Sequence, residues 1–357
     1  MIHQMEPWIG DEERKAVDAY LSSGGWLIEY RQTEQFARMV CDYVGARHCS
    51  ILPNGTITLF AILASLGIGP SDEVLVPDYT MIASANAVVL AGGRPVFIDV
   101  DPRTLCMDLN LAEAAITKRT RAIMLVSMNG RSPDMEHAVE LARCHQLALV
   151  EDAAQSLGSS WRGRHLGTFG IAGSFSFSPQ KIITTGQGGA IVTDDDEMAH
   201  RIAQIRDFGR RQRGVDVHDS IGYNFKFTDI QAVIGIEQMK KLEWRVRRKR
   251  EIFDLYRSFL KDIEQVQFLE TDLDNVTPWF VDIQVPDPLA LKAHLAGKEI
   301  GSRVFYPPIH SQPAYGQPGF FPNTELAAGH GLWLPSSSAL EDVVIERICS
   351  EIKAFYN

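Results

Sequence analysis

Three short polar segments are the parts of this chain most able to do chemistry. Asn54-Gly55-Thr56, Asp152 and Lys181 each lie at or just beyond the end of a strand-like apolar run. Open α/β sheets bind ligands at the carboxyl ends of their strands. The three segments are therefore predicted to meet at one site, provided that the runs form strands of one sheet.

The segment Asn54-Gly55-Thr56 opens a helical pattern. The first backbone N–H groups of a helix have no partner inside the helix, so together with a threonine hydroxyl they can bind an anion such as a phosphate. The competing interpretation is a turn that caps the helix and binds no ligand. The segment alone does not separate these two possibilities.

Asp152 follows the apolar run ALV and a first acid, Glu151. A partly buried carboxylate at this place needs a cation or strong hydrogen bonds, and a protonated pyridine nitrogen is one suitable cation. The alternative is an ordinary helix N-terminus with an acidic first turn.

Lys181 follows the run SFSFS, residues 174–178, in which the serines share one face and the phenylalanines the other. This pattern predicts that Ser176 faces a polar pocket while the phenylalanines pack. A lysine delivered into a partly dry pocket loses affinity for its proton and becomes an amine nucleophile for a carbonyl. A surface lysine in a loop is the alternative.

Anion-binding turn, strand-end aspartate and lysine together describe a pyridoxal 5′-phosphate (PLP) site, with one group each for the phosphate, the ring nitrogen and the aldehyde. The patterns GxxxxGK, GxGxxG, GxSxG and HExxH are missing from the sequence. Nucleotide-triphosphate, dinucleotide, serine-hydrolase and zinc-protease functions therefore lose their support. No metal site is predicted.

The elements that must position these residues alternate along the chain. Strand-like runs at 49–52, 73–76, 95–100, 122–126, 148–150, 174–178 and 190–193 are separated by helical patterns such as 56–66, 82–90, 135–144 and 197–207. This alternation predicts an α/β fold with a mostly parallel central sheet and helices on both faces. We expect a large domain, 1–245, and a smaller C-terminal α+β domain, 246–357, with strands at 277–285 and 301–306 and a helix at 340–356. The basic run RVRRKR, 245–250, is interpreted as a solvated helix face.

The composition fits an ordinary globular enzyme. The 357 residues carry a net charge of −10, which argues against a nucleic-acid partner. Five widely spaced cysteines without a CxxC pair fit free thiols in the cytoplasm. An acidic N-terminus and apolar runs far below the ~20 residues of a membrane span argue against a signal peptide and a membrane anchor.

Nearly the whole chain resembles the DegT/DnrJ/EryC1/StrS sugar aminotransferases, which are fold-type I PLP enzymes. The motifs that carry this resemblance are NGT at Asn54, GIGPSDEVLVPDYT at Gly67, PVFIDVDPRT at Pro95, VEDAAQSLGS at Val150, FSFSPQKIITTGQGG at Phe175 and GYNFKFTDIQAVIG at Gly222. The last two are especially similar to GDP-perosamine synthases within the family.

The resemblance implies roles for individual residues. Lys181 would bond to the aldehyde of PLP, Asp152 would pair with the ring nitrogen, and Gln155 would lie near the phenolic oxygen. The phosphate would be held by Gly55, Thr56 and Ser176.

The resemblance also implies a homodimer with shared active sites, in which Asn224 reaches the phosphate of the neighbouring subunit's cofactor. Two positions depart from the family pattern. Met81 stands where an aromatic residue commonly stacks on the cofactor ring, and Tyr79 is left open as a replacement. Asn129 stands where relatives often have an aromatic residue near the sugar.

The segment RVFYPPIHSQPAY makes Arg303, Tyr306 and His310 candidates for the substrate pocket together with Asn129, although His310 equally fits a packed histidine. The implied activity is transfer of an amino group from glutamate to a keto-sugar, nucleotide-linked as in perosamine synthases, for lipopolysaccharide or other amino-sugar biosynthesis. A 3-keto sugar or a non-nucleotide keto-octulosonate stays open as acceptor. The alternatives of another class are a fold-type I lyase or desulfurase and a non-catalytic PLP-binding regulator.

Overall fold

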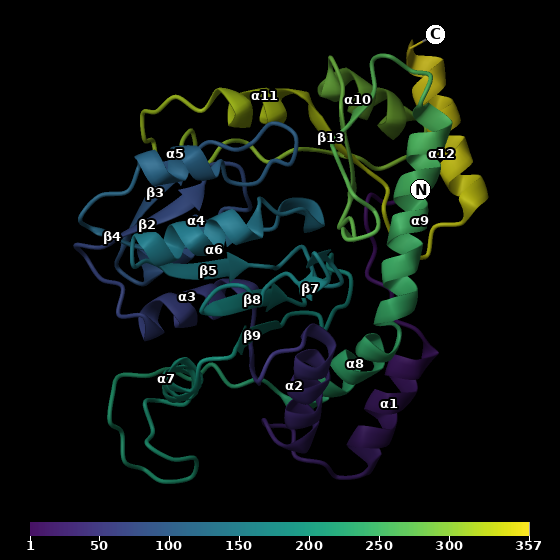
Figure 1. Ribbon diagram of the computed structural model, residues 1–357. Coiled ribbons are helices and arrows are strands. Elements are labelled where there is room, and N and C mark those ends of the chain that lie inside the picture. The colour runs from purple at the N-terminus through teal and green to yellow at the C-terminus, as the bar shows by residue number, and fades with distance from the viewer. Residues whose placement is uncertain (357) are drawn as a thin grey trace.

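A seven-stranded sheet forms the centre of the larger lobe in the computed structural model, which describes residues 1–356 (Figure 1). The strand order is β1-β9-β8-β5-β4-β2-β3. The five strands from β8 to β3 run parallel to one another, whereas β9 runs antiparallel to both β8 and β1. The bounds are β1 His48–Leu52, β2 Glu73–Pro77, β3 Arg94–Ile98, β4 Thr120–Val126, β5 Ala148–Asp152, β8 Ala172–Ser176 and β9 Gly189–Thr193.

Helices cover both faces of this sheet because successive residues of each strand point to opposite sides. In β4, Ala122 and Met124 pack in the cluster with α3, α4 and α7, while Ile123 and Leu125 pack against α5 and α6. A strand buried on both faces is apolar throughout, which explains its unbroken apolar run. The helix bounds are α3 Gly55–Ser65, α4 Ala83–Leu90, α5 Leu109–Ala114, α6 Met135–Cys144 and α7 Asp196–Arg206.

The β1, β8 and β9 end of the sheet is covered by α2 (Arg31–Val44) and α8 (Asp229–Lys240). Phe177 packs there against Phe36 of α2, and Phe175 lies in the same buried cluster, so the phenylalanine face of the SFSFS run is buried as predicted. The N-terminal helix α1 (Asp11–Ser22) lies against α8. A short ribbon of β6 (Ser160–Trp161) and β7 (Arg164–His165) and a 3-10 turn, η1 (Met128–Gly130), complete this lobe.

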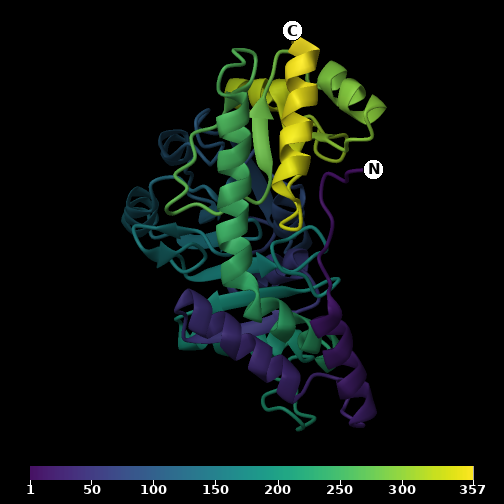
Figure 2. The same ribbon diagram turned by 90° about the vertical axis from the view of Figure 1, so that its right-hand side faces the viewer.

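The smaller lobe contains an antiparallel sheet of order β10-β11-β13-β12. Its strands are β10 Gln267–Phe268, β11 Val281–Gln284, β12 Arg303–Val304 and β13 Gly331–Leu334, and its helices are α10 Pro288–Gly297, α11 Pro322–His330 and α12 Asp342–Tyr356. The long helix α9 (Leu242–Leu260) runs from the larger lobe into this one and lies beside α12 (Figure 2). Among the described residues, no helix is long and apolar enough to cross a membrane.

The predicted α/β architecture is confirmed, and three local expectations need comment. The strand expected at 277–285 is reduced to β11, since Pro278 has no N–H to donate and the Asn129 side chain pairs with Phe280. The solvated face expected for 245–250 is wrong for Arg245 and Lys249, which are buried in α9 and donate to backbone carbonyls.

The predicted division at 245/246 falls inside α9. Ile2 forms a bridge with Ile300, and the Ser336 N–H donates to the Gln4 carbonyl, so the first residues of the chain pair with the smaller lobe. The division by residue number stays a prediction.

Candidate active site

A cavity of about 530 Å³ opens beside the carboxyl ends of β5 and β8. It brings together nine of the residues predicted for the site. They are Gly55, Thr56, Met81, Asp152, Gln155, Ser176, Lys181, Arg303 and Tyr306. In the sequence these residues are up to about 250 positions apart. Their convergence follows from the order of the parallel strands.

The start of α3 forms one end of the cavity. The Asn54 side chain caps the helix by accepting from the Ile57 N–H at 3.0 Å, while the N–H groups of Gly55 and Thr56 have no acceptor among the described residues. A Cβ on Gly55 would lie 3.1 Å from Cβ of Ser176, so glycine permits this close approach. Two free N–H groups and two hydroxyls at a helix N-terminus suit a phosphate.

Asp152 ends β5 and turns its carboxylate into the cavity. Burial raises the pKa of this carboxyl, and hydrogen bonds from the Ser84 hydroxyl and the Ala154 N–H, together with the charge of Lys181, oppose that rise. The two hydrogen bonds measure 2.7 Å and 3.1 Å. Neither donor is a cation, so the ionised carboxylate gains most from a positively charged ring nitrogen.

The neighbouring acid, Glu151, has a different function. Its side chain points to the opposite face of β5 and accepts from the backbone N–H groups of Gly167, Phe169 and Gly170. Glu151 therefore holds a loop, and the alternation of the strand leaves Asp152 alone at the cavity.

Lys181 enters the cavity from the turn after β8. Burial lowers the pKa of its amine to about 8, and the charge of Asp152 opposes this shift. The amine lies 3.8 Å from the ring centre of Trp279. A lysine with this pKa is neutral often enough near pH 8 to attack a carbonyl, as the sequence predicted.

Two predicted cofactor residues differ in how they reach the cavity. The Met81 side chain is about half exposed and lines the cavity, whereas Tyr79 is fully buried and packs against Phe305. Of the two, only Met81 lines the cavity, and its stacking on a cofactor ring stays a prediction. Gln155 is buried beside the cavity, and its side-chain oxygen accepts from the Asn129 N–H at 2.8 Å.

Of the predicted substrate residues, Arg303 and Tyr306 line the cavity together, with the guanidinium 5.2 Å from the tyrosine ring. His310 does not line it, because its Nδ1 lies 2.6 Å from the buried Asp78 and its ring stacks on Phe321. That pair fixes the segment after Tyr306 to the turn after β2.

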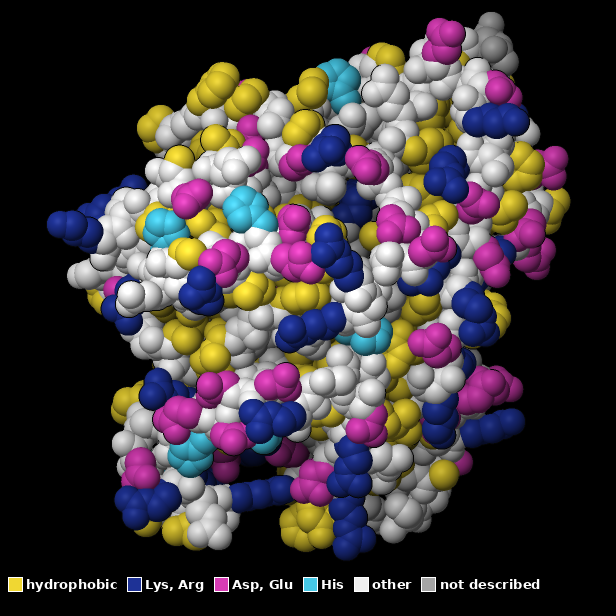
Figure 3. Space-filling view, in the orientation of Figure 1, with side chains coloured by type: hydrophobic (Ala, Val, Ile, Leu, Met, Phe, Trp, Pro, Cys, Tyr) yellow, Lys and Arg dark blue, Asp and Glu magenta, His cyan; other side chains and the backbone are white. Residues whose placement is uncertain are grey.

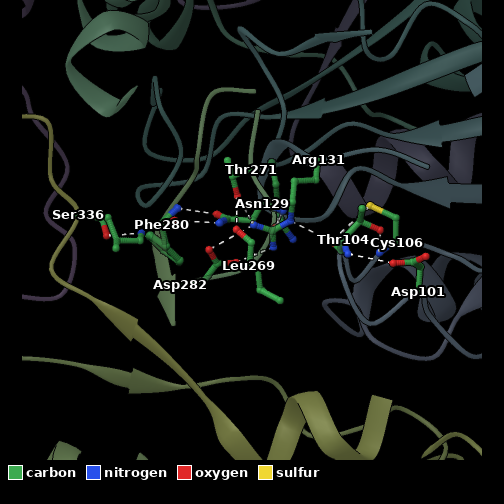
Figure 4. A network of polar contacts seen from close by, with 12 residues as sticks. Asp101, Thr104, Cys106, Asn129, Arg131, Leu269, Thr271, Phe280, Asp282 and Ser336 are labelled. Atoms are coloured by element: carbon green, nitrogen blue, oxygen red, sulfur yellow. Dashed lines mark hydrogen bonds and ion pairs between the residues drawn. The ribbon is translucent and has the colours of Figure 1, made fainter. Parts of the chain in front are cut away.

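Two further predicted residues lie away from the cavity of their own chain. Asn129 is fully buried, and its backbone N–H donates to the Gln155 side chain. Its own side chain pairs with the backbone of Phe280 (Figure 4). Asn224 is exposed in the loop between α7 and α8, where it forms a bridge with Asp207.

Sequence reasoning missed two residues at the site. Ser84 hydrogen-bonds Asp152 from the first turn of α4, and Trp279 covers the Lys181 amine from the smaller lobe. Neither lies in a segment with a recognisable chemical pattern. Within residues 1–356, no cluster of histidine, cysteine and acidic side chains is suited to hold a metal ion.

The cavity fits PLP by the chemistry of its groups: free N–H groups at one end, a buried carboxylate without a strong cationic partner, and a lysine of lowered pKa. Such a cofactor, when bound, would supply an aldehyde for the amine and an electron-accepting ring.

Comparisons with known proteins agree with this arrangement. The model of the DegT/DnrJ/EryC1/StrS aminotransferase family matches residues 7–353. A GDP-perosamine synthase of Escherichia coli O157:H7 is 35% identical over 99% of this chain and 98% of its own length. A UDP-2-acetamido-2-deoxy-3-oxo-D-glucuronate aminotransferase of Pseudomonas aeruginosa is 32% identical over 96% of both chains. The structure of Spr1654 from Streptococcus pneumoniae in its PMP form superposes with a TM-score of 0.91 at 26% identity, covering 98% of each chain.

Proposed function

Since this chain belongs to the DegT/DnrJ/EryC1/StrS aminotransferase family, we propose that it uses PLP to move an amino group from glutamate to a nucleotide-linked keto-sugar. The observation that carries the proposal is the meeting of Lys181, Asp152 and the free start of α3 in one cavity. Lys181 can bind the aldehyde, Asp152 can pair with the ring nitrogen, and the start of α3 can bind the phosphate.

Each of these residues has a separate task. Gly55, Thr56 and Ser176 would bind the phosphate and so fix the cofactor's position. The ionised Asp152 would keep the ring nitrogen protonated, and the ring would supply an electron-accepting group. Lys181 would bind the aldehyde, and its amine, when free, can hold and release a proton at Nζ. The amine can do so because its pKa, about 8, lies close to neutral pH.

A nucleotide-linked acceptor is supported by the similarity to a GDP-perosamine synthase and to an aminotransferase of a UDP-linked 3-oxo sugar. Arg303 supports it physically, because its guanidinium lines the cavity and can pair with a diphosphate. The product would serve lipopolysaccharide or other amino-sugar biosynthesis. The free cysteines support a cytoplasmic location.

We also propose a homodimer with shared sites. Apolar side chains are exposed on the segment before α2 and on the loop after α7; they are Trp26, Leu27, Ile28, Tyr30, Phe208, Val215, Val217, Ile221 and Tyr223. A hollow of about 200 Å³ lies between these segments, and the loop stands away from the body of the chain (Figures 1 and 3). A second copy would cover this surface and bring Asn224 into use.

The face drawn in Figure 3 carries acidic and basic side chains interspersed. This mixed surface suits a protein whose specific ligands enter a cavity, since binding along a nucleic acid uses a continuous basic surface.

The test has two stages. Protein loaded with PLP is mixed with glutamate, and 2-oxoglutarate and the loss of visible cofactor absorbance are measured; nucleotide-linked 4-keto sugars, 3-keto sugars and a keto-octulosonate are then screened for return of that absorbance. If the absorbance returns only with a nucleotide-linked sugar, the proposal is supported. If it returns only with the octulosonate, the proposed acceptor is replaced by this non-nucleotide sugar.

Other results would change the reaction class. Sulfide, ammonia or pyruvate released from amino acids would indicate a lyase or desulfurase. Failure of every keto-sugar would favour a PLP-binding regulator. Full transamination by Lys181→Ala would refute the mechanism.

A further inference from the structure

The Lys181 amine has an unusual set of neighbours. It lies 3.8 Å from the ring centre of Trp279, and it makes no hydrogen bond to any of residues 1–356. The other charged or titratable groups that line its cavity are Asp152, Arg303 and Tyr306. The face of an indole ring attracts a cation. Beside the charge of Asp152, the indole face of Trp279 is therefore a group that can stabilise the protonated amine.

Trp279 is held in place by two hydrogen bonds. Its Nε1–H donates to the carbonyl of Gln180 at 2.7 Å, and its own carbonyl accepts from the buried Lys249 amine at 2.7 Å. The indole is 5% exposed and stacks on Phe280, with ring centres 3.9 Å apart. The position of Trp279 is thus coupled to that of Phe280.

The Asn129 side chain fixes Phe280 by pairing with both backbone polar groups of that residue. The Asn129 Oδ1 accepts from the Phe280 N–H at 2.6 Å, and the Asn129 Nδ2 donates to the Phe280 carbonyl at 2.8 Å (Figure 4). The Asn129 backbone has φ 55°, a left-handed conformation that asparagine tolerates better than most residues. A side-chain amide has the donor and the acceptor that this pairing needs, whereas leucine has neither.

We propose that Trp279 holds the protonated Lys181 amine inside the cavity by its indole face, and that Asn129 is a positioning residue that keeps Trp279 there. The inference takes from the proposed function only that Lys181 is the reactive lysine. In the cofactor-free chain the amine is free, and Trp279 then determines where the amine lies and how strongly it holds its proton.

The first test measures the protonation of Lys181 in the cofactor-free full-length protein. Brief acetylation at a series of pH values, followed by peptide mass spectrometry, gives the pH at which half of the Lys181 amines react, with the exposed Lys118 as internal reference. Trp279→Leu removes the indole face and should weaken proton affinity roughly two- to thirty-fold, so the midpoint moves to lower pH. Trp279→Phe keeps a ring and should move it less.

Asn129→Leu should move the midpoint in the same direction while Trp279 is present. In the double variant with Trp279→Leu, Asn129→Leu should cause no further movement, because its effect acts through the indole. The matched control is Thr324→Val, which removes a buried hydroxyl that bonds Asp99 outside the cavity. It should lower stability and leave the midpoint of Lys181 unchanged.

An unchanged or raised midpoint in Trp279→Leu would overturn the role of the indole. If Asn129→Leu moves the Lys181 midpoint equally with and without Trp279, the positioning role of Asn129 is overturned. The same follows if Asn129→Leu lowers stability but does not move the midpoint. None of these results depends on transamination. A failed transaminase assay with a shifted Lys181 midpoint would therefore count against the proposed function and leave this inference standing.

Discussion

The buried ion pair between Arg131 and Asp282 gives a prediction whose size follows from the structure. The two side chains are 2% and 1% exposed, and their closest contact, Nη2 to Oδ2, is 2.6 Å. Arg131 also donates from Nε to the Thr104 carbonyl at 2.9 Å, so this one guanidinium joins the turn after β4, the loop after β3 and strand β11 (Figure 4).

Asp282→Asn keeps the volume of the side chain but leaves the guanidinium buried without its counter-charge. Such an uncompensated charge costs ~3–5 kcal/mol, whereas replacing both partners by apolar residues of similar volume is often neutral or stabilising. We therefore expect Asp282→Asn to lower the free energy of unfolding by ~3–5 kcal/mol, and Arg131→Met with Asp282→Leu to recover most of that loss.

Equilibrium unfolding in urea, followed by circular dichroism, measures both changes. The exposed pair of Arg143 and Glu140 is the control, and Glu140→Gln should leave the free energy of unfolding almost unchanged because solvent screens this pair. The reasoning is refuted if Asp282→Asn costs no more than this control. It is also refuted if the double variant loses as much stability as the separate variants Arg131→Met and Asp282→Leu lose together.

Three further outcomes are expected. Asp152→Asn should weaken PLP binding and reduce transamination by at least ~100-fold, because the neutral amide cannot keep the ring nitrogen protonated; equal activity in both proteins, measured at saturating PLP, would contradict this role. Capture of PLP by the cofactor-free chain should accelerate as the pH rises through about 8, since the lowered pKa of Lys181 frees the amine there; stopped-flow absorbance that instead rises only near pH 10 would contradict it. Mixing inactive Lys181→Ala and Asn224→Ala chains should restore about a quarter of wild-type activity if sites are shared across a two-fold dimer, and nothing if each chain is self-sufficient.

The larger lobe was predictable because its strands are buried on both faces. An apolar run such as β4 is typical of a strand that is buried on both faces of a parallel sheet. The polar residues that follow such strands meet at the carboxyl edge of that sheet. Lys181 and Asp152 could be chosen for the same reason, since each follows such a run.

The contributions of the smaller lobe could not be predicted in this way. Trp279 follows a proline in an irregular segment, so no periodic pattern marks the side on which its ring lies. Asn129 faces Phe280, 151 positions away, and only the docking of the lobes brings the two together. The prediction of a solvated face for the basic run in α9 was wrong for a related reason. Arg245 and Lys249 donate to backbone carbonyls between the lobes, and these acceptors lie far from them in the sequence.

The helix α9 has a mechanical consequence. Its 19 residues form one uninterrupted rod, about 28 Å long, that belongs to both lobes. The N-terminal segment runs from the smaller lobe to α1 as a second link (Figure 2). Because two separate segments connect the lobes, we expect the lobes not to open and close against each other. We expect ligands to be admitted by the rearrangement of single side chains at the rim, Met81 and Arg303 among them, while the frame around the lysine stays stiff.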